Sequence, residues 1–195
     1  MSQARITEYP ADKQFVDRWS PRAFADESID DQTLFTLFEA ARWAPSAYNV
    51  QPWRFTYAKK GSGSWDTYLE FLNDFNRSWA SKASALIVVL SKTVTVTQQA
   101  EVENPSHSFD AGAAWGGLAL QAELLGWSTH GMTGIVKERI REVLALPDNI
   151  EVQAVIAVGK RGDKSSLPEG LQAKEAPSDR RSLKETVFEG LSFKE

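Results

Sequence analysis

Residues 108–126 contain an apolar segment that limits how this chain can fold. The segment includes the sequence FDAGAAWGGLALQAELLG, in which alanine, glycine and leucine occupy nearly every side of a helix. A helix that is apolar all round is normally buried. Glycine inside a helix costs roughly 1 kcal/mol relative to alanine, so we expect Gly112, Gly116 and Gly117 to permit close approach of another backbone. A chain of 195 residues has little material to cover such a helix and also form a ligand pocket, which favours a homodimer.

Strands and further helices alternate around this segment. Residues 53–58 alternate apolar and polar side chains, and residues 85–90 read ALIVVL. Both patterns predict strands. Periodicity also predicts shorter helices and further strands, at residues 31–43, 67–76, 136–144, 127–131 and 152–158. This interleaving assigns the chain to the mixed α+β class.

Two other stretches show no clear periodicity. Residues 92–105 are rich in threonine, glutamine and glutamate, which predicts a polar surface loop. A lid over a binding site is the alternative, because long loops in compact domains often carry function. The polar tail after Gly159 contains proline and glycine, and we expect it to dock on the main body or on a partner.

The composition argues against several classes of function. Lysine and arginine total 22 and aspartate and glutamate 26, a net charge of −4, which argues against general nucleic-acid or membrane-surface binding. The absence of cysteine removes disulfides, thiol nucleophiles and cysteine-bound metals. His107 and His130, the two histidines, lack metal-ligand spacing. With no secretory signal pattern and no long apolar run, we expect a cytoplasmic protein.

Basic side chains cluster in the sequence RWSPRAF near the N-terminus. Arg18 and Arg22 offer rigid forks of donors that suit a phosphate, and Ser20 adds a hydroxyl. The alternative is a surface pair bonded to nearby aspartates. A second basic pair, Arg180 and Arg181, is a candidate to converge on the same anion.

A proline-bracketed segment, APSAYNVQPWRF, follows the first predicted helix. Pro45 and Pro52 exclude regular helix between them. The amides of Asn49 and Gln51 present both donors and acceptors, which suit the edge of a flat heterocycle. A plain turn between helix and strand is the alternative.

Taken together, these motifs resemble the FMN-dependent nitroreductase family. The shared features occur in the family's order: RxSxRxF, a helix ending AARWAPS, NxQPWRF, DAG within the small-residue helix, GMTG, a strand ending VGK, and RRxLKE. The resemblance extends from about residue 17 to residue 187. It implies one nitroreductase-like FMN-binding domain over residues 1–195, with a central, mostly antiparallel sheet flanked by helices, in an intertwined homodimer.

The resemblance also implies a cofactor site assembled from separate segments. The first motif and a C-terminal arginine would hold the FMN phosphate. The proline-bracketed turn would lie against the isoalloxazine and ribityl groups of the flavin bound mainly by the other chain, and residues 131–134 would approach N5. The implied cofactor-binding residues are Arg18, Trp19, Ser20, Arg22, Pro45, Ser46, Asn49, Gln51, Met132, Thr133, Gly134, Arg180 and Arg181.

The function implied by the resemblance is electron transfer from NADH or NADPH to a nitroaromatic, quinone or similar small acceptor, by a ping-pong mechanism. Since FMN carries the redox chemistry, neither a catalytic side chain nor a metal is expected. Two alternatives stay open: a non-redox flavin-binding or regulatory protein on the same scaffold, and a flavin enzyme with a different reaction, such as dehalogenation. The identity of the acceptor and the preferred nicotinamide are not predicted.

Overall fold

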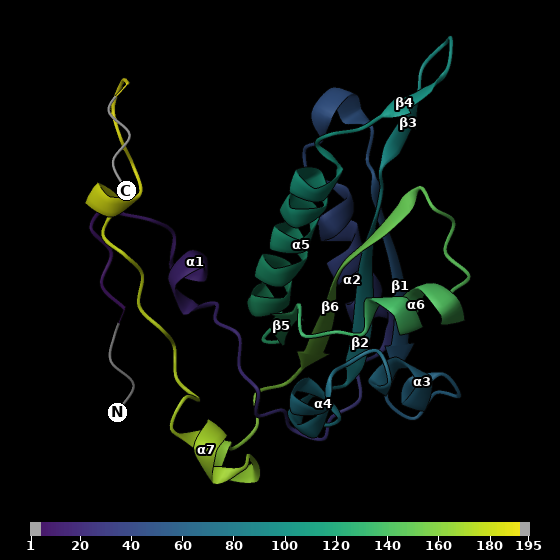
Figure 1. The fold of residues 1–195 in the computed structure, drawn as a ribbon. Coiled ribbons are helices and arrows are strands. Elements are labelled where there is room, and N and C mark those ends of the chain that lie inside the picture. The colour runs from purple at the N-terminus through teal and green to yellow at the C-terminus, as the bar shows by residue number, and fades with distance from the viewer. Residues whose placement is uncertain (1–4, 192–195) are drawn as a thin grey trace.

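The computed structural model describes residues 5–191. At its centre is a four-stranded sheet in the order β1-β2-β6-β5, in which every neighbouring pair is antiparallel (Figure 1). The strands are β1 (Trp53–Lys59), β2 (Ala85–Lys92), β5 (Ser128–Met132) and β6 (Ile150–Gly159). Residues 85–91 are buried, as expected for an apolar strand in the middle of a sheet that is covered on both faces. The predicted antiparallel sheet flanked by helices is therefore confirmed.

One face of the sheet is covered by the two longest helices, α2 (Asp31–Arg42) and α5 (His107–Leu124). Asp30 caps α2, because its side chain accepts the N–H of Thr33, and the helix ends at Trp43 as its pattern predicts. The side chains of Leu34 and Leu118 are fully buried in the shared cluster. This pair of helices gives the sheet a continuous apolar cover.

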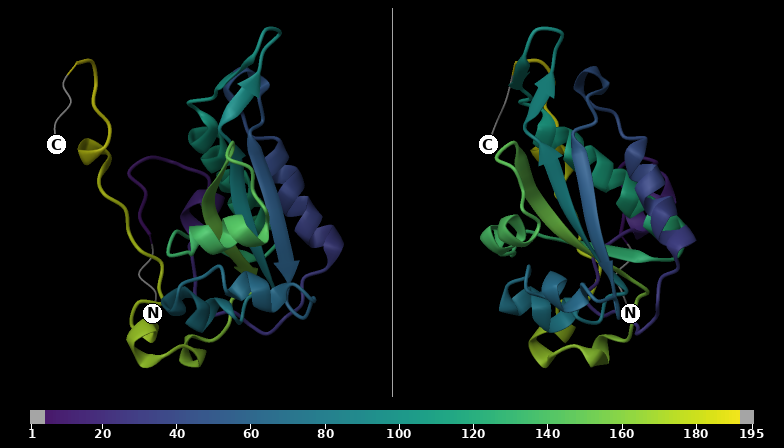
Figure 2. Two further views of the ribbon diagram at one scale, coloured as in Figure 1. Left: turned by 45° about the vertical axis from the view of Figure 1, so that its right-hand side comes forward. Right: turned by 90° about the vertical axis from the view of Figure 1, so that its right-hand side faces the viewer.

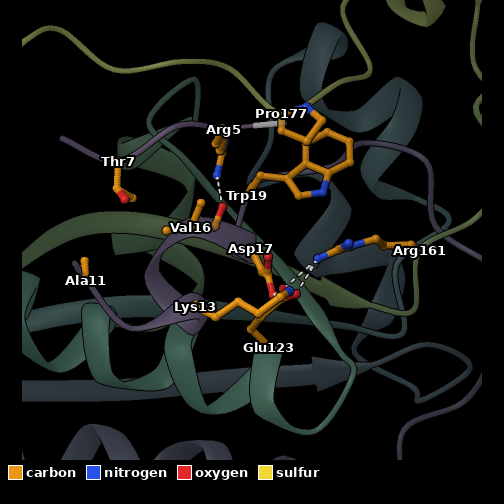
Figure 3. Close-up of a pocket in the computed structure, with 10 residues that line it drawn as sticks. All are labelled: Arg5, Thr7, Ala11, Lys13, Val16, Asp17, Trp19, Glu123, Arg161 and Pro177. Carbon is orange, nitrogen blue, oxygen red and sulfur yellow. Dashed lines mark hydrogen bonds and ion pairs between the residues drawn. The ribbon is translucent and has the colours of Figure 1, made fainter. Parts of the chain in front are cut away.

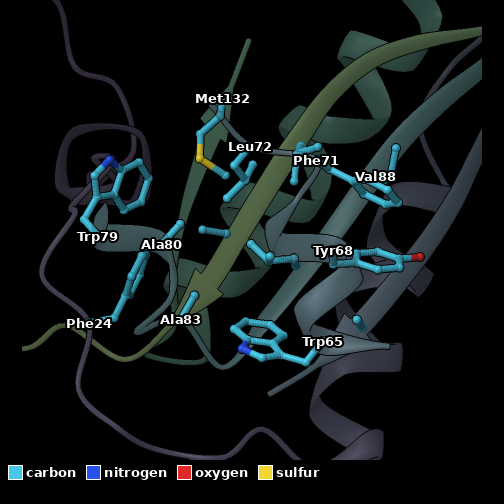
Figure 4. Packing of buried hydrophobic residues seen from close by; sticks show 14 of the residues in the cluster. Phe24, Trp65, Tyr68, Phe71, Leu72, Trp79, Ala80, Ala83, Val88 and Met132 are labelled. Carbon is cyan, nitrogen blue, oxygen red and sulfur yellow. The ribbon is translucent and has the colours of Figure 1, made fainter. Parts of the chain in front are cut away.

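The opposite face carries three short helices, α3 (Trp65–Leu69), α4 (Asp74–Ala80) and α6 (Lys137–Val143). Aromatic side chains from α3, α4 and the segment between these two helices pack on the sheet, and Phe71 and Trp79 among them are almost completely buried (Figure 4). This cluster reaches the end of the sheet where the N-terminal region crosses it. It therefore supports the segment that carries the first basic motif.

The prediction of one continuous helix over residues 67–76 is wrong. The chain forms two helices there, because Asn73 begins a new one: its side chain accepts the N–H of Asn76, and its own N–H bonds the carbonyl of Gly134. Phe75, in the second of these helices, is 54% exposed.

The stretch predicted as a polar loop over residues 92–105 forms a hairpin instead. Strands β3 (Val94–Val96) and β4 (Glu101–Glu103) pair antiparallel and project from the end of the sheet (Figures 1 and 2). Most residues of these two strands are exposed, so a search for buried apolar runs in the sequence does not detect the hairpin.

Helix α5 is partly exposed in the single chain, which does not cover the helix on every side. Only one of its three glycines makes a close contact: a Cβ at Gly117 would lie 3.1 Å from the carbonyl oxygen of Ala40 in α2. A Cβ at Gly112 or Gly116 would meet no described atom within 4 Å. Phe109 is 82% exposed, so α5 presents an apolar outer face.

Both ends of the described chain lie outside this core. The N-terminal segment contains α1 (Lys13–Asp17), and the C-terminal tail contains α7 (Glu169–Gln172) and runs away from the sheet (Figures 1 and 2). The two ends touch each other, since the N–H of Leu183 donates to Glu8 at 3.0 Å. Short 3-10 turns complete the description, at Ala47–Asn49, Lys164–Ser166 and Leu183–Glu185. Within residues 5–191, no helix combines the length and hydrophobicity that a membrane span requires.

Candidate functional site

A basic cavity of about 380 Å³ lies where the N-terminal segment, the first motif, β5 and the C-terminal tail meet. It brings together the first basic motif and a distant arginine, Arg180, as the sequence predicts. No carboxylate is among the described residues that line it, although the chain is acidic overall. Those lining residues are Arg5, Arg18, Trp19, Ser20, Arg22, His130, Lys174, Ala176, Ser178 and Arg180.

Helix α1 sets the position of Arg18. This residue ends the helix: its N–H bonds the carbonyl of Gln14 at 3.2 Å, and its backbone then turns to an extended conformation. Its guanidinium donates to the hydroxyl of Ser20 at 3.3 Å. The two polar groups therefore share one side of the cavity.

Arg22 is held against the aromatic cluster beneath the sheet. Its guanidinium carbon lies 5.9 Å from the centre of the Trp79 ring. Its Nε atom is buried and finds no hydrogen-bond partner among residues 5–191. A buried donor without a hydrogen-bond partner destabilises the folded protein unless an acceptor binds to it. An anionic oxygen in the cavity would supply that acceptor.

The cavity gathers cations at an electrostatic cost. Burial, and then repulsion from Arg180, lower the pKa of Arg18, and the same two causes lower the pKa of Arg5. Each effect shows that the charged form is disfavoured where it stands. A dianion would offset both, so the donor set fits a phosphate group well.

His130 is a wall residue of this cavity that sequence reasoning did not place there. Its Nδ1 atom lies 3.0 Å from the carbonyl oxygen of Pro21, and its ring lies 4.6 Å from the Trp79 ring. Burial and the nearby Arg22 charge lower the pKa of His130. Lys174 and Arg5 also escaped sequence reasoning, because both lie outside the recognised motifs.

A second cavity, of about 400 Å³, shares Arg18 and Ser20 with the first. It runs over α5 and β5, with Trp115, Gly116 and Gly131 among its lining residues. A Cβ at Gly131 would lie 3.3 Å from the Trp115 ring, so glycine keeps this wall open. The two cavities together give a basic end and a more neutral extension along α5.

A larger cavity of about 650 Å³ lies beside them, but its chemistry differs (Figure 3). Arg161 is neutralised there by Glu123, with both carboxylate oxygens at 2.7 Å. Asp17 also lines this cavity. Its mixed charge makes it a poorer anion site than the smaller basic cavity.

The proline-bracketed turn is not near the basic cavity within one chain. The N–H of Ala47 bonds the Asp110 carboxylate at 3.2 Å, close to the start of α5. The second cavity reaches α5 at Trp115, five residues later, which is about 7.5 Å along the helix axis. None of Pro45, Ser46, Asn49 and Gln51 is among the described residues that line either cavity.

The turn itself has an unusual backbone. Tyr48, Asn49 and Gln51 have φ values of 49°, 55° and 52°, a region that side chains other than glycine rarely adopt. The Ser46 hydroxyl accepts the N–H of Gln51 at 3.0 Å and holds this shape. Backbone strain of this kind clusters at functional sites.

The remaining predicted site residues are divided between the core and other surfaces. Met132 is buried in the core, and the carbonyl of Gly134 is occupied by Asn73 and the side chain of Asn76. Thr133, between them, is exposed. Arg180 and Arg181 both line a further cavity, formed with the N-terminal segment, but only Arg180 is among the described residues that line the basic cavity.

His107 is not among the described residues that line the basic cavity. In the part of the chain that the structure describes, no cluster of three or more histidines and carboxylates suits a metal ion. His107 is the first residue of α5. Its ring forms a hydrogen bond with the Ser91 hydroxyl at 2.8 Å and lies 3.6 Å from the Glu151 carboxylate.

Comparisons with known proteins relate the chain to a family of oxidoreductases. The model of the nitroreductase family matches residues 16–72, which include both the first basic motif and the proline-bracketed turn. A crystal structure of an oxidoreductase containing FMN is 48% identical, covers 97% of each chain and superposes with a TM-score of 0.95. A provisionally named nitroreductase from Desulfovibrio desulfuricans, solved in complex with FMN, is 25% identical, with 94% of this chain and 98% of the other covered and a TM-score of 0.73. A protein of Archaeoglobus fulgidus, provisionally named NADH dehydrogenase/NAD(P)H nitroreductase, is 27% identical over 80% of this chain and 88% of its own length.

Proposed function

Because the chain belongs to the nitroreductase family of oxidoreductases, we propose that it binds FMN and transfers electrons from NAD(P)H to a nitroaromatic, quinone or similar small acceptor. The observation that carries the proposal is the basic cavity, with its four arginines among the described lining residues and no carboxylate. FMN in two structural relatives supports the choice of anion. The name of the Archaeoglobus fulgidus relative supports a nicotinamide donor.

Several residues of the basic cavity would bind the phosphate group of the cofactor. Arg18, Arg22 and Arg180 would bind the phosphate oxygens, and Ser20 would donate a further hydrogen bond. Charge-assisted bonds contribute roughly 1.5–3 kcal/mol each, so two or three of them anchor a phosphate firmly. The adjoining cavity along α5 offers room for the rest of the molecule.

Bound FMN would supply the redox chemistry, by taking up electrons from the nicotinamide and passing them to the acceptor. The protein's own part is to hold the cofactor, keep one side of the site accessible and exclude competing groups. Donor and acceptor would then use the same space in turn, which is a ping-pong mechanism. No side chain needs to act as acid, base or nucleophile.

We further propose that the complete site forms in a homodimer. The strained turn at residues 45–51 supplies no described lining residue to the basic cavity or to the second cavity, so a single chain does not complete the site. The outer face of α5, with exposed Phe109 and open space beside Gly112 and Gly116, is suited to a second copy. In such a pair, Pro45, Ser46, Asn49 and Gln51 would serve the flavin held by the partner, and the turn at residues 132–134 would approach the ring.

The test is anaerobic titration of the purified, FMN-loaded protein with NADPH and, separately, NADH. We expect loss of the visible flavin absorbance with at least one donor, recovery on adding a quinone, and parallel double-reciprocal plots. A protein that binds FMN but is reduced by neither donor would refute the redox proposal. Light scattering on the same sample tests the dimer, and a monomer that keeps stoichiometric FMN would refute the shared site.

A further inference from the structure

Arg5 is bonded to the backbone of the first basic motif, although it lies 13 residues before Arg18. Its Nη1 atom donates to the carbonyl oxygen of Val16 at 2.7 Å (Figure 3). The same atom donates to the carbonyl oxygen of Arg18 at 2.8 Å. Carbonyls at the end of a helix have no partner within it, and here one arginine supplies bonds to two of them. Arg5 therefore fixes the backbone from which the Arg18 and Ser20 side chains project.

The same guanidinium also faces the basic cavity. Arg5 is one of its lining residues, beside Arg18 and Arg180. Its Nε atom is buried and has no hydrogen-bond partner in residues 5–191, as is true of Arg22. Arg5 thus shares its charge and partial burial with Arg18 and Arg22, and its unmet donor with Arg22, but it lies outside every recognised motif.

We propose that Arg5 is a further phosphate-binding residue, which also positions Arg18, and that it makes the N-terminal segment part of the cofactor site. The proposal rests on the proposed function in taking the FMN phosphate as the anion. Repulsion from Arg180 opposes the docking of Arg5, and a bound phosphate removes that opposition. Anion binding and docking of residues 5–16 are then coupled, and linkage makes the coupling reciprocal.

The first experiment compares the variants Arg5→Ala, Arg5→Lys and Lys13→Ala. Lys13 is a matched control, because it is a cation of the same segment whose side chain is 83% exposed and paired with Asp17. FMN and riboflavin are titrated into each protein by flavin fluorescence quenching. Arg5→Ala should weaken FMN roughly 10- to 150-fold while leaving riboflavin unchanged, because only FMN carries the phosphate. Arg5→Lys should recover part of the loss, and Lys13→Ala should match the wild type.

Two results would overturn the proposal. One is unchanged FMN affinity in Arg5→Ala. The other is an equal loss for FMN and riboflavin, which would assign Arg5 a purely structural role. Both differ from failure of the proposed function, in which the wild-type protein itself would not bind FMN.

A second measurement needs no variant and covers the case in which Arg5→Ala does not fold. Hydrogen exchange is followed over residues 5–18 of the wild-type protein, alone and with FMN, riboflavin or inorganic phosphate. We expect slower exchange with FMN and with inorganic phosphate, and no change with riboflavin. An exchange rate that changes with neither FMN nor inorganic phosphate would contradict the coupling.

Discussion

Glu175 accepts the backbone N–H groups of Arg22 and Ala23 through a single carboxylate oxygen, each at 2.8 Å. This contact joins residues 153 positions apart and anchors the C-terminal tail beside the first basic motif. The other carboxylate oxygen of Glu175 is buried and finds no partner within residues 5–191. One acidic side chain thus holds together two of the segments that supply arginines to the basic cavity, the first basic motif and the C-terminal tail.

The Glu175 contact predicts different outcomes for two substitutions. Glu175→Gln keeps an oxygen that accepts both N–H groups and removes a negative charge near the arginines, so FMN affinity should be unchanged or higher. Glu175→Ala leaves two backbone donors without a partner, at a cost of about 1–3 kcal/mol for each donor that stays buried. Urea denaturation and FMN titration check both variants. Identical behaviour of the two would show that the contact has no role beyond the charge.

The two adjacent arginines of the tail should differ sharply in their effect on cofactor binding. Arg180 lines the basic cavity, whereas Arg181 lines a cavity formed with the N-terminal segment. Arg180→Ala should therefore weaken FMN roughly 10- to 150-fold, the loss expected for one charge-assisted contact. Arg181→Ala is the matched control and should bind FMN like the wild type. Equal losses in both variants would point to general charge attraction.

Gly117 should be the glycine of α5 that least tolerates a side chain. A Cβ there would lie 3.1 Å from the Ala40 carbonyl oxygen, so Gly117→Ala forces α2 and α5 apart. Overpacking of this kind costs about 1–3 kcal/mol. Gly170→Ala is the control, because a Cβ in that helix meets no described atom within 4 Å. Thermal denaturation compares the two, and a Gly117→Ala protein as stable as the control would refute the close contact.

His130 should make folding stability depend on pH below neutrality. Burial and the Arg22 charge lower the pKa of His130 from its ordinary 6.5, while the Pro21 carbonyl and Glu175 act in the opposite direction. The unfolded chain therefore binds this proton more readily than the folded one, so the free energy of unfolding falls as pH drops below about 6.5. Denaturation between pH 8 and pH 5 measures that slope. It should be smaller in His130→Gln, and an unchanged slope would assign the effect to other groups.

Local patterns predicted most of the core but not the hairpin. The Asp30 cap and the apolar run at residues 85–90 each encode their element within a few residues, and both elements form where expected. The β3–β4 hairpin is largely exposed, and its local signal is only a short alternation of threonine and valine at residues 93–97. The break before Asn73 depends on the carbonyl of Gly134, which belongs to a distant part of the chain.

The sequence analysis predicted that this region binds an anion, but it predicted only some of the residues that line the basic cavity. The close spacing of Arg18 and Arg22, and the guanidinium group that both carry, indicate an anion site from the sequence alone. Arg5 and His130 join them only because the fold brings the N-terminal segment and β5 to one place. No periodicity in the irregular tail distinguishes Arg180 from Arg181, so only the three-dimensional arrangement separates them.

The claim that the basic cavity holds the FMN phosphate is tested most directly by comparing FMN with riboflavin on the wild-type protein. Each flavin is titrated at fixed salt and pH, and its dissociation constant is taken from fluorescence quenching. Two charge-assisted contacts of roughly 1.5–3 kcal/mol each predict that FMN binds at least about 100-fold more tightly than riboflavin. Equal affinity for the two flavins would contradict the account.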